Sequence, residues 1–145
     1  MLLRTPQRFL AANVSTYFMT QHIPYEQIRK RPCDFIVKYK FLTKEEGGRQ
    51  TGLPHQGIRS DFMYAGDNPR TDGIYMIHPE FLDKEGNVIT EKIAVPESGK
   101  ANMWVVNLDF WEYHRKRITI GTKGYFMEGP KITAECEVIE IIGLK

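Results

Sequence analysis

The side chains best suited to binding a ligand are concentrated in one polar loop. Its first part, Lys44 to Arg49, has the sequence KEEGGR, and several turn-forming residues and His55 follow it. The loop thus combines an acidic pair, an arginine and a histidine within a short stretch. Loops held on a rigid scaffold often carry binding residues, although simple solvation explains the same composition. Both interpretations of this loop stay open at the level of the sequence.

The sequence carries no recognisable catalytic motif, and we therefore expect a protein that is not an enzyme. The run GGRQTG lacks the Gly-Lys-Ser/Thr ending of a phosphate-binding P-loop, so no nucleotide binding is expected. The histidines are far apart without metal-ligand spacing, and no Ser or Cys has the context of a nucleophile elbow. His55 with Asp61, or His114 with Asp109, could be acid–base pairs, but surface polar residues explain both better. The sequence predicts no catalytic residue, no metal site and no cofactor.

Two strands are expected to hold the polar loop. Apolar and polar residues alternate between Phe35 and Phe41, which predicts a strand with one buried face. A second strand is predicted from Ser60 to Tyr64. Between them, Gly47 and Gly48 allow positive φ angles, so the chain can turn or bulge there. Strand, long loop and returning strand together predict a wide hairpin.

The C-terminal third predicts further short strands. Residues 101–109 form an apolar run, in which we expect Trp104, Val106 and Leu108 to share the buried side. The charged run 112–116 is expected to be a turn.

Beyond this turn, residues 118–127 predict two short strands about a glycine turn, and residues 128–131 predict another turn. Residues 132–141 alternate, and the inward-facing residues are expected to be Ile132, Ala134, Cys136 and Val138. Short strands with turn signals about every 8 to 12 residues are typical of a closed barrel or a sandwich.

These residues resemble a known family. The run FIVKYKFLTKEEGGRQTG, followed by a short loop and SDFMY, is similar to the start of the C-terminal β-barrel domain of elongation factor Tu. In that family a strand runs into K-E-E-G-G-R-H-T-P and returns through a loop to an aromatic-rich strand. Residues 95–99 stand where the family has a P-G-D turn, and the later strands resemble its final meander. The resemblance covers roughly residues 34–142, except for the middle third.

The resemblance implies a fold and a set of binding residues. The expected fold is mostly β: a closed antiparallel β-barrel of about six strands, with a short N-terminal helical segment and an inserted hairpin. In that family the barrel contacts the backbone of aminoacyl-tRNA and also protein partners, while GTP hydrolysis belongs to a separate domain that this chain lacks. The residues implied to bind RNA or a partner are Lys44, Glu45, Glu46, Gly47, Gly48, Arg49, Gly129 and Lys131.

Two departures from the family leave the function open between two alternatives. The family's R-H-T-P is R-Q-T-G here, and Pro130 removes a backbone donor from the second turn. One alternative is a non-catalytic module that binds tRNA, other RNA or a translation protein through the KEEGGR loop. The other is a protein–protein interaction or self-associating module that keeps only the barrel scaffold. Fold alone does not decide between them.

An N-terminal extension, residues 1–33, is expected to precede the barrel domain, residues 34–145. A helix is predicted over residues 6–12, residues 13–20 fit helix or strand, and residues 23–32 predict a short helical turn that ends at Pro32. The basic cluster RKR at the end of this turn could touch phosphates, although a solvated end that complements the helix dipole explains it better.

An insertion is expected within the barrel domain at about residues 66–92. It begins with a run of turn formers, continues with a strand from Ile74 to Ile77, and includes a hairpin turn at residues 83–87. A role in recognising a partner and an addition without function explain this insertion equally well.

Composition excludes several classes of protein. The 145 residues leave room for one domain with a core, and the net charge of +2 is too small to attract nucleic acid without a local patch. No stretch approaches the roughly 20 apolar residues that cross a bilayer, and the N-terminus lacks the apolar core of a secretory signal. Cys33 and Cys136 have no metal spacing and fit reduced thiols, so the predicted location is cytoplasmic.

Overall fold

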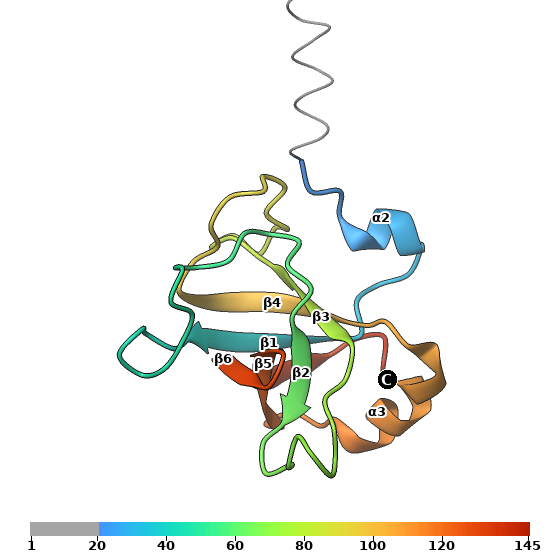
Figure 1. The fold of residues 1–145 in the computed structure, drawn as a ribbon. Coiled ribbons are helices and arrows are strands. Elements are labelled where there is room, and N and C mark those ends of the chain that lie inside the picture. Colours follow the sequence, from blue (N-terminus) through green and yellow to red (C-terminus); the bar gives the residue numbers. More distant parts are fainter. Residues whose placement is uncertain (1–20) are drawn as a thin grey trace, which may run out of the picture.

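The computed structural model describes residues 21–145, which form a curled antiparallel sheet of six strands, a half-barrel with few helices (Figure 1). The strand order is β2-β5-β6-β1-β4-β3. The elements in chain order are α2 (Tyr25–Arg29), β1 (Phe35–Phe41), β2 (Asp61–Tyr64), β3 (Ile77–Phe81), β4 (Ser98–Val105), the 3₁₀ helix η1 (Leu108–Phe110), α3 (Trp111–Arg117), β5 (Lys123–Glu128) and β6 (Lys131–Ile141). The prediction of a mostly β domain with about six antiparallel strands is confirmed.

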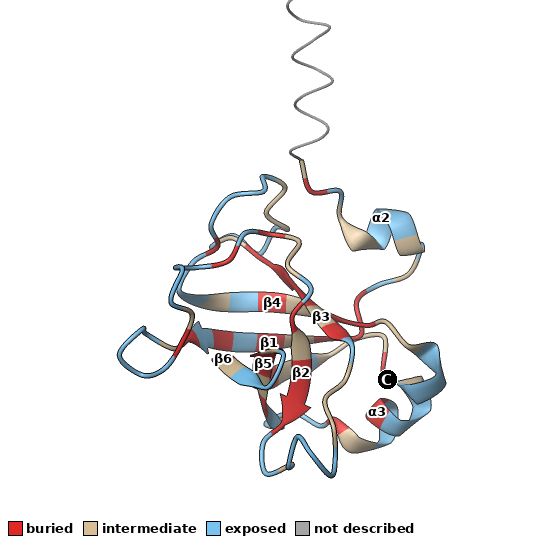
Figure 2. Ribbon diagram, viewed as in Figure 1, coloured by how far each residue is buried: buried red, intermediate tan, exposed pale blue. Residues whose placement is uncertain are grey.

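Strand β1 lies in the middle of the sheet and shows the predicted alternation. It pairs with β4 on one side and with β6 on the other. Its buried residues alternate with more exposed ones along the strand (Figure 2). The buried residues are those predicted, namely Phe35, Val37, Tyr39 and Phe41. This period of two arises because successive side chains of a strand point to opposite faces.

Aromatic rings fill the concave side of the sheet. The ring of Tyr39 lies 5.1 Å from that of Phe81 and 5.9 Å from that of Phe126, between centroids. Phe41 contacts the same two phenylalanines at 6.0 Å. Each fully buried ring of this kind contributes roughly 1.5–3 kcal/mol, so these contacts between β1, β3 and β5 hold the curl of the sheet.

The two edge strands of the sheet approach each other through a single backbone bridge. The N–H of Phe62 in β2 donates to the carbonyl of Tyr75, and the N–H of Tyr75 donates to the carbonyl of Phe62, both at 2.8 Å. Tyr75 precedes β3, so the predicted strand at residues 74–77 begins later than expected. Strand β3 lies within the predicted insertion 66–92 and forms one edge of the sheet against β4.

The predicted hairpin at residues 83–87 is confirmed. Leu82 and Val88 form an isolated bridge across it, and the N–H of Asp83 donates to the carbonyl of Asn87 at 2.8 Å. The carboxylate of Asp83 accepts hydrogen bonds from the backbone of Glu85 and Asn87, which fixes the turn between them.

The expected buried side of residues 101–109 was wrong. The core residues of β4 are Ala101, Met103 and Val105, whereas Trp104 is buried on the opposite, outer face beneath α2. Leu108, expected inside, is 63% exposed. A continuous apolar run has no alternation, and a covering helix on the outer face makes both faces of β4 apolar.

The charged run 112–116 is helical, not the expected turn. It belongs to α3, which is anchored because Trp111 Nε1 donates to Asp34 Oδ1 at 3.1 Å. Residues 118–122 form a turn, so only one of the two strands expected over residues 118–127 exists, namely β5. By contrast, the predicted inward orientation of Ala134, Cys136 and Val138 in β6 is confirmed, because all three are buried.

The segment before β1 contains the predicted helical turn. Helix α2 lies within residues 23–32, and Lys30 ends it with a left-handed φ of 56°. The predictions for residues 6–12 and 13–20 lie outside the described residues.

Candidate functional site

The KEEGGR loop is a tightly hydrogen-bonded turn that follows β1. The N–H of Thr43 donates to Glu46 Oε1 at 2.8 Å, and the N–H of Glu46 donates back to Thr43 Oγ1 at 3.1 Å. This reciprocal arrangement is that of a capping box. The hydrogen bonds from Thr43 lower the pKa of the exposed Glu46 carboxyl. The role of Glu46 is therefore to hold the turn.

The two glycines of the loop serve different purposes. Gly47 has a φ of 90°, which residues with a Cβ rarely adopt, and it faces open space. Gly48 has no positive φ, but a Cβ there would collide with the backbone carbonyl of Leu42. One glycine is needed for the backbone angle and the other for a close approach of two chain segments.

Arg49 joins the two regions that were predicted to bind RNA. Its Nε lies 2.9 Å from Oε2 of Glu128, the residue before Gly129 in the β5–β6 turn. Gly129 has a φ of 60°, and Lys131 begins β6 with an exposed side chain. The predicted residues from both places therefore do lie on one surface.

A hollow of about 220 Å³ opens beside this loop. We call it the Arg49 hollow, and it is lined by Phe41, Leu42, Thr43, Lys44, Arg49, Gly52, Leu53 and Glu97. Arg49 is 21% exposed there, and Lys44 adds a second positive charge. Apolar walls with a few charged groups are typical of a recognition site.

The basic side chains of the site are fully opposed by acidic ones. Lys44, Arg49 and Lys131 face four acidic residues, namely Glu45, Glu46, Glu97 and Glu128. Long-range attraction for a polyanion is therefore weak, and binding would depend on direct contacts at Arg49 and Lys44.

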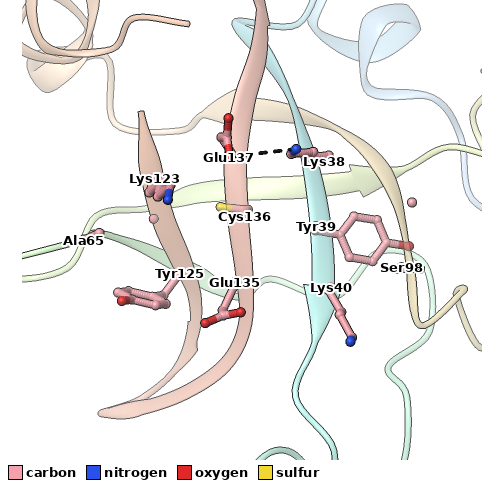
Figure 3. A pocket seen from close by; sticks show the side chains of 12 residues that line it. Lys38, Tyr39, Lys40, Ala65, Ser98, Lys123, Tyr125, Glu135, Cys136 and Glu137 are labelled. Carbon is pink, nitrogen blue, oxygen red and sulfur yellow. Dashed lines mark ion pairs between the residues drawn. The ribbon is translucent and has the colours of Figure 1, made fainter. Parts of the chain in front are cut away.

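A wider furrow, of about 500 Å³, crosses the outer face of β4, β1, β6 and β5 (Figure 3). Its floor is backbone at residues that pair across the strands, and its walls carry Lys38, Glu137 and Lys123 on one side and Lys40, Glu135 and Tyr125 on the other. Lys38 Nζ lies 3.9 Å from Glu137 Oε1. Cross-strand pairs of opposite charge stabilise a sheet by roughly 0.2–1 kcal/mol each, which accounts for this arrangement without a ligand.

Neither imagined acid–base pair exists in the described residues. His55 is exposed and pairs with Ala94 only through its backbone. His114 is fully buried instead of lying on the surface, and its Nδ1 is 2.7 Å from the hydroxyl of Tyr64. Burial, with a smaller effect of Arg117, lowers the pKa of His114 to about 4.

Sequence analysis also missed a polar cluster around Glu80. This buried carboxylate accepts hydrogen bonds from the backbone of Tyr25 at 2.8 Å and from Trp104 Nε1 at 3.1 Å, and His22 Nε2 lies 2.6 Å from it. The available signal was a glutamate next to apolar residues in a predicted strand region, between Pro79 and Phe81, because a buried carboxylate requires partners.

Within residues 21–145, no group of three or more His, Cys, Asp or Glu side chains is arranged to hold a metal ion. None of the helices described in this range is long and apolar enough to cross a membrane.

No protein-family model matches the chain, and no curated protein matches it. The resemblance to elongation factor Tu therefore stays a prediction made from the KEEGGR run and its neighbours.

Proposed function

We propose that this chain is a non-catalytic module that binds the phosphate backbone of RNA, tRNA included, at the Arg49 hollow. One observation supports this most directly. Arg49 pairs with Glu128 at 2.9 Å, yet Glu128 Oε2 accepts no hydrogen bond from the described residues. Arg49 also lines the hollow, and a phosphate oxygen is a geometrically suitable acceptor for its planar fork of donors.

The fold supports a second proposal, which concerns the family of barrels that this domain resembles. We propose that the half-barrel is the barrel of the elongation factor Tu C-terminal domain, closed through the bridge between Phe62 and Tyr75. The two backbone hydrogen bonds of that bridge and the aromatic core between β1, β3 and β5 support this comparison. Two free, buried thiols, Cys33 and Cys136, agree with the proposed cytoplasmic location, since a reducing compartment keeps thiols unpaired.

Fluorescence anisotropy with labelled tRNA over a range of salt concentrations tests the RNA proposal. The logarithm of the affinity should fall linearly with the logarithm of salt concentration, because phosphate contacts release counterions. Arg49→Ala should weaken binding and reduce the slope by about one unit. Lys84→Ala, in the 83–87 turn, removes one positive charge away from the hollow and should change neither quantity. Absence of salt-sensitive tRNA binding by the folded wild-type protein would refute the proposal.

A cluster of exposed apolar residues favours a second candidate function, binding of a protein partner or self-association. The ring of Tyr75 lies 5.8 Å from Phe110 and 5.7 Å from Tyr113, and both of those residues are more than 40% exposed. Met76 and Leu108 extend the cluster. Exposed apolar patches of this kind mark interaction sites. Light scattering tests self-association: a dimer that Phe110→Ser dissociates supports it, and a monomer at all concentrations contradicts it.

A further inference from the structure

The wide furrow on the outer face of the sheet lies between two rows of side chains that cross four strands (Figure 3). Each row takes one residue from each strand, in register. In the order β4, β1, β6 and β5, the first row is Lys100, Lys38, Glu137 and Lys123, and the second is Ser98, Lys40, Glu135 and Tyr125. Since strands lie about 4.8 Å apart and alternate residues about 6.7 Å apart, the furrow is about 14 Å long and about 7 Å wide. This shape suits an extended chain that lies across the strands.

The floor of the furrow is backbone. Between the two rows, Gly99, Tyr39, Cys136 and Gly124 are in register across the same four strands. Tyr39 and Cys136 belong to the core and are almost completely buried, and the two glycines have no side chain. A ligand in the furrow would therefore lie against the backbone of the sheet and meet side chains at its walls.

The two rows carry more positive than negative charge. They contain four lysines and two glutamates, and all four lysines are exposed. Within residues 21–145, only Lys38 among these lysines makes an ion pair, at 3.9 Å from Glu137. Both glutamates lie on β6, in register with lysines of β1 and β5, whereas β4 contributes no acidic residue. Pairs of opposite charge therefore account for the lysines of β1 and β5 but not for Lys100.

Lys100 instead lies directly opposite another lysine. It is in register with Lys38 across the pairing of β4 with β1, and both side chains are exposed on the outer face. Like charges in this arrangement destabilise a sheet, whereas an anion between them is attracted by both. Ser98 adds an exposed hydroxyl from the second row. The end of the furrow at β4 and β1 is thus suited to a phosphate group.

The other end of the furrow supplies an aromatic ring. Tyr125 of β5 is half-buried and ends the second row (Figure 3). In grooves that bind single-stranded nucleic acid, aromatic rings stack on unpaired bases while basic side chains contact the backbone. An acidic peptide would use the lysines but has no base to stack on Tyr125. The combination of lysines and an aromatic ring therefore favours a nucleic acid strand.

The furrow adjoins the Arg49 hollow. Lys40 and Ser98 are in register in the second row, and their chain neighbours Phe41 and Glu97 line the hollow. The N–H of Phe41 donates to the carbonyl of Glu97 at 2.9 Å, which continues the pairing of β1 with the chain before β4 from the furrow into the hollow. The two concave sites therefore form one continuous surface.

We propose that the furrow binds a segment of single-stranded RNA, with a phosphate at Lys38 and Lys100 and a base on the ring of Tyr125. This inference rests on the proposed function, since it takes RNA as the ligand, and it adds a preference for single strands over duplexes. In a duplex the bases are paired and stacked on one another, so none is free to lie on Tyr125. Phosphate contacts at the Arg49 hollow alone are open to both forms.

Fluorescence anisotropy of the full chain tests this preference with a labelled oligouridylate and a blunt-ended RNA duplex of equal length. The oligouridylate should bind more tightly than the duplex. Tyr125→Thr, which keeps a strand-forming residue, should weaken oligouridylate binding about fivefold or more and leave the affinity for the duplex unchanged. An unchanged affinity of Tyr125→Thr for the oligouridylate, or an equal loss for both forms of RNA, would overturn the inference.

Lysine substitutions test the phosphate contact. Lys38→Gln and Lys100→Gln should each reduce the salt slope of oligouridylate binding by about 0.7 unit, the amount that one phosphate contact contributes in a single strand. Lys116→Gln removes an exposed lysine of α3, outside the furrow, and should leave the slope unchanged. A wild-type slope in Lys100→Gln would contradict the proposed contact.

Arg49→Ala separates the furrow from the hollow. If it weakens binding of both forms of RNA while the furrow variants change neither, the hollow binds RNA and the furrow does not. If the furrow variants weaken oligouridylate binding and Arg49→Ala does not, the furrow binds RNA without the hollow. Polyglutamate of equal length is the competitor for the remaining alternative. Should it displace the oligouridylate as well as unlabelled oligouridylate does, the ligand would be an acidic peptide and the inference would fail.

Discussion

His22 Nε2 lies 2.6 Å from Glu80 Oε2, and both side chains are almost completely buried although 58 positions separate them in the sequence. The same carboxylate accepts the N–H groups of Tyr25 and Trp104. A single glutamate on edge strand β3 therefore fastens the segment that leads into α2 onto the outer face of the sheet.

Removing this carboxylate should destabilise the protein strongly. Glu80→Ala leaves the N–H groups of Tyr25 and Trp104 and the imidazole of His22 without this partner, and we expect the free energy of unfolding to fall by about 3–5 kcal/mol. Glu85→Ala, at an exposed position of the 83–87 turn, should change it by less than about 0.5 kcal/mol. Urea denaturation measures both. Equal stability of the two variants would show that the Glu80 cluster does not hold α2.

The two glycines of the KEEGGR loop should differ in their tolerance of alanine. Gly47→Ala places a Cβ in open space and costs only the strain of a positive φ, about 1–2 kcal/mol. Gly48→Ala forces a Cβ against the carbonyl of Leu42, and we expect a larger loss, about 3 kcal/mol. Thermal unfolding of both variants tests the order. If Gly47→Ala proved the more destabilising of the two, this assignment of roles would be wrong.

Stability should decline in mild acid because of His114. Its pKa is about 4 in the folded protein and near 6.5 in the unfolded chain, so the unfolded chain binds more protons between these values. The stabilisation is complete above about pH 6.5 and is lost as the pH falls towards 4, by up to about 1.4 kcal/mol per pH unit. Urea midpoints at pH 7, 6 and 5 measure this loss. In His114→Gln the midpoints should depend less steeply on pH over the same range, and equal slopes would contradict the prediction.

The two thiols should be inert in the native protein. Burial raises the pKa of Cys33 and of Cys136 to about 12, so little of the reactive thiolate exists at neutral pH. Ellman's reagent should react with neither thiol in the folded chain and with both in urea. A thiol that reacted at the same rate in both conditions would have to be exposed.

Strands with clear alternation could be predicted from the sequence. In β1 and β6 most apolar residues fall on one face, because only that face packs on the aromatic core. Strand β4 could not be oriented in this way, since Met103, Trp104 and Val105 are all apolar. Its outer face is covered by α2, a contact between distant parts of the chain that periodicity does not reveal.

Helix α3 shows a different limit. Its charged residues suggested a turn, but Trp111, His114 and Ile118 recur at helical spacing and face inward. Two of these anchors are polar or amphipathic, and they are bound by Asp34 and Tyr64. A search for apolar residues at helical spacing does not detect such a helix.

The candidate site could be predicted in position but not in detail. Arg49 and Gly129 were expected on one surface only through the resemblance, and the pairing of Arg49 with Glu128 places them there. The charge around them depends on which acidic side chains the fold brings near, and Glu97, the residue before β4, comes from a distant segment.

The central position of β6 has a consequence for how the chain folds during its synthesis. This strand pairs with both β1 and β5, yet it is made after every other strand. Until residue 141 has left the ribosome, β1 and β5 have no common neighbour, and the nascent chain exposes their apolar faces. Assembly of the sheet must therefore wait for the last of its strands, and we expect chaperones that hold unfinished chains to retain this one until β6 has emerged.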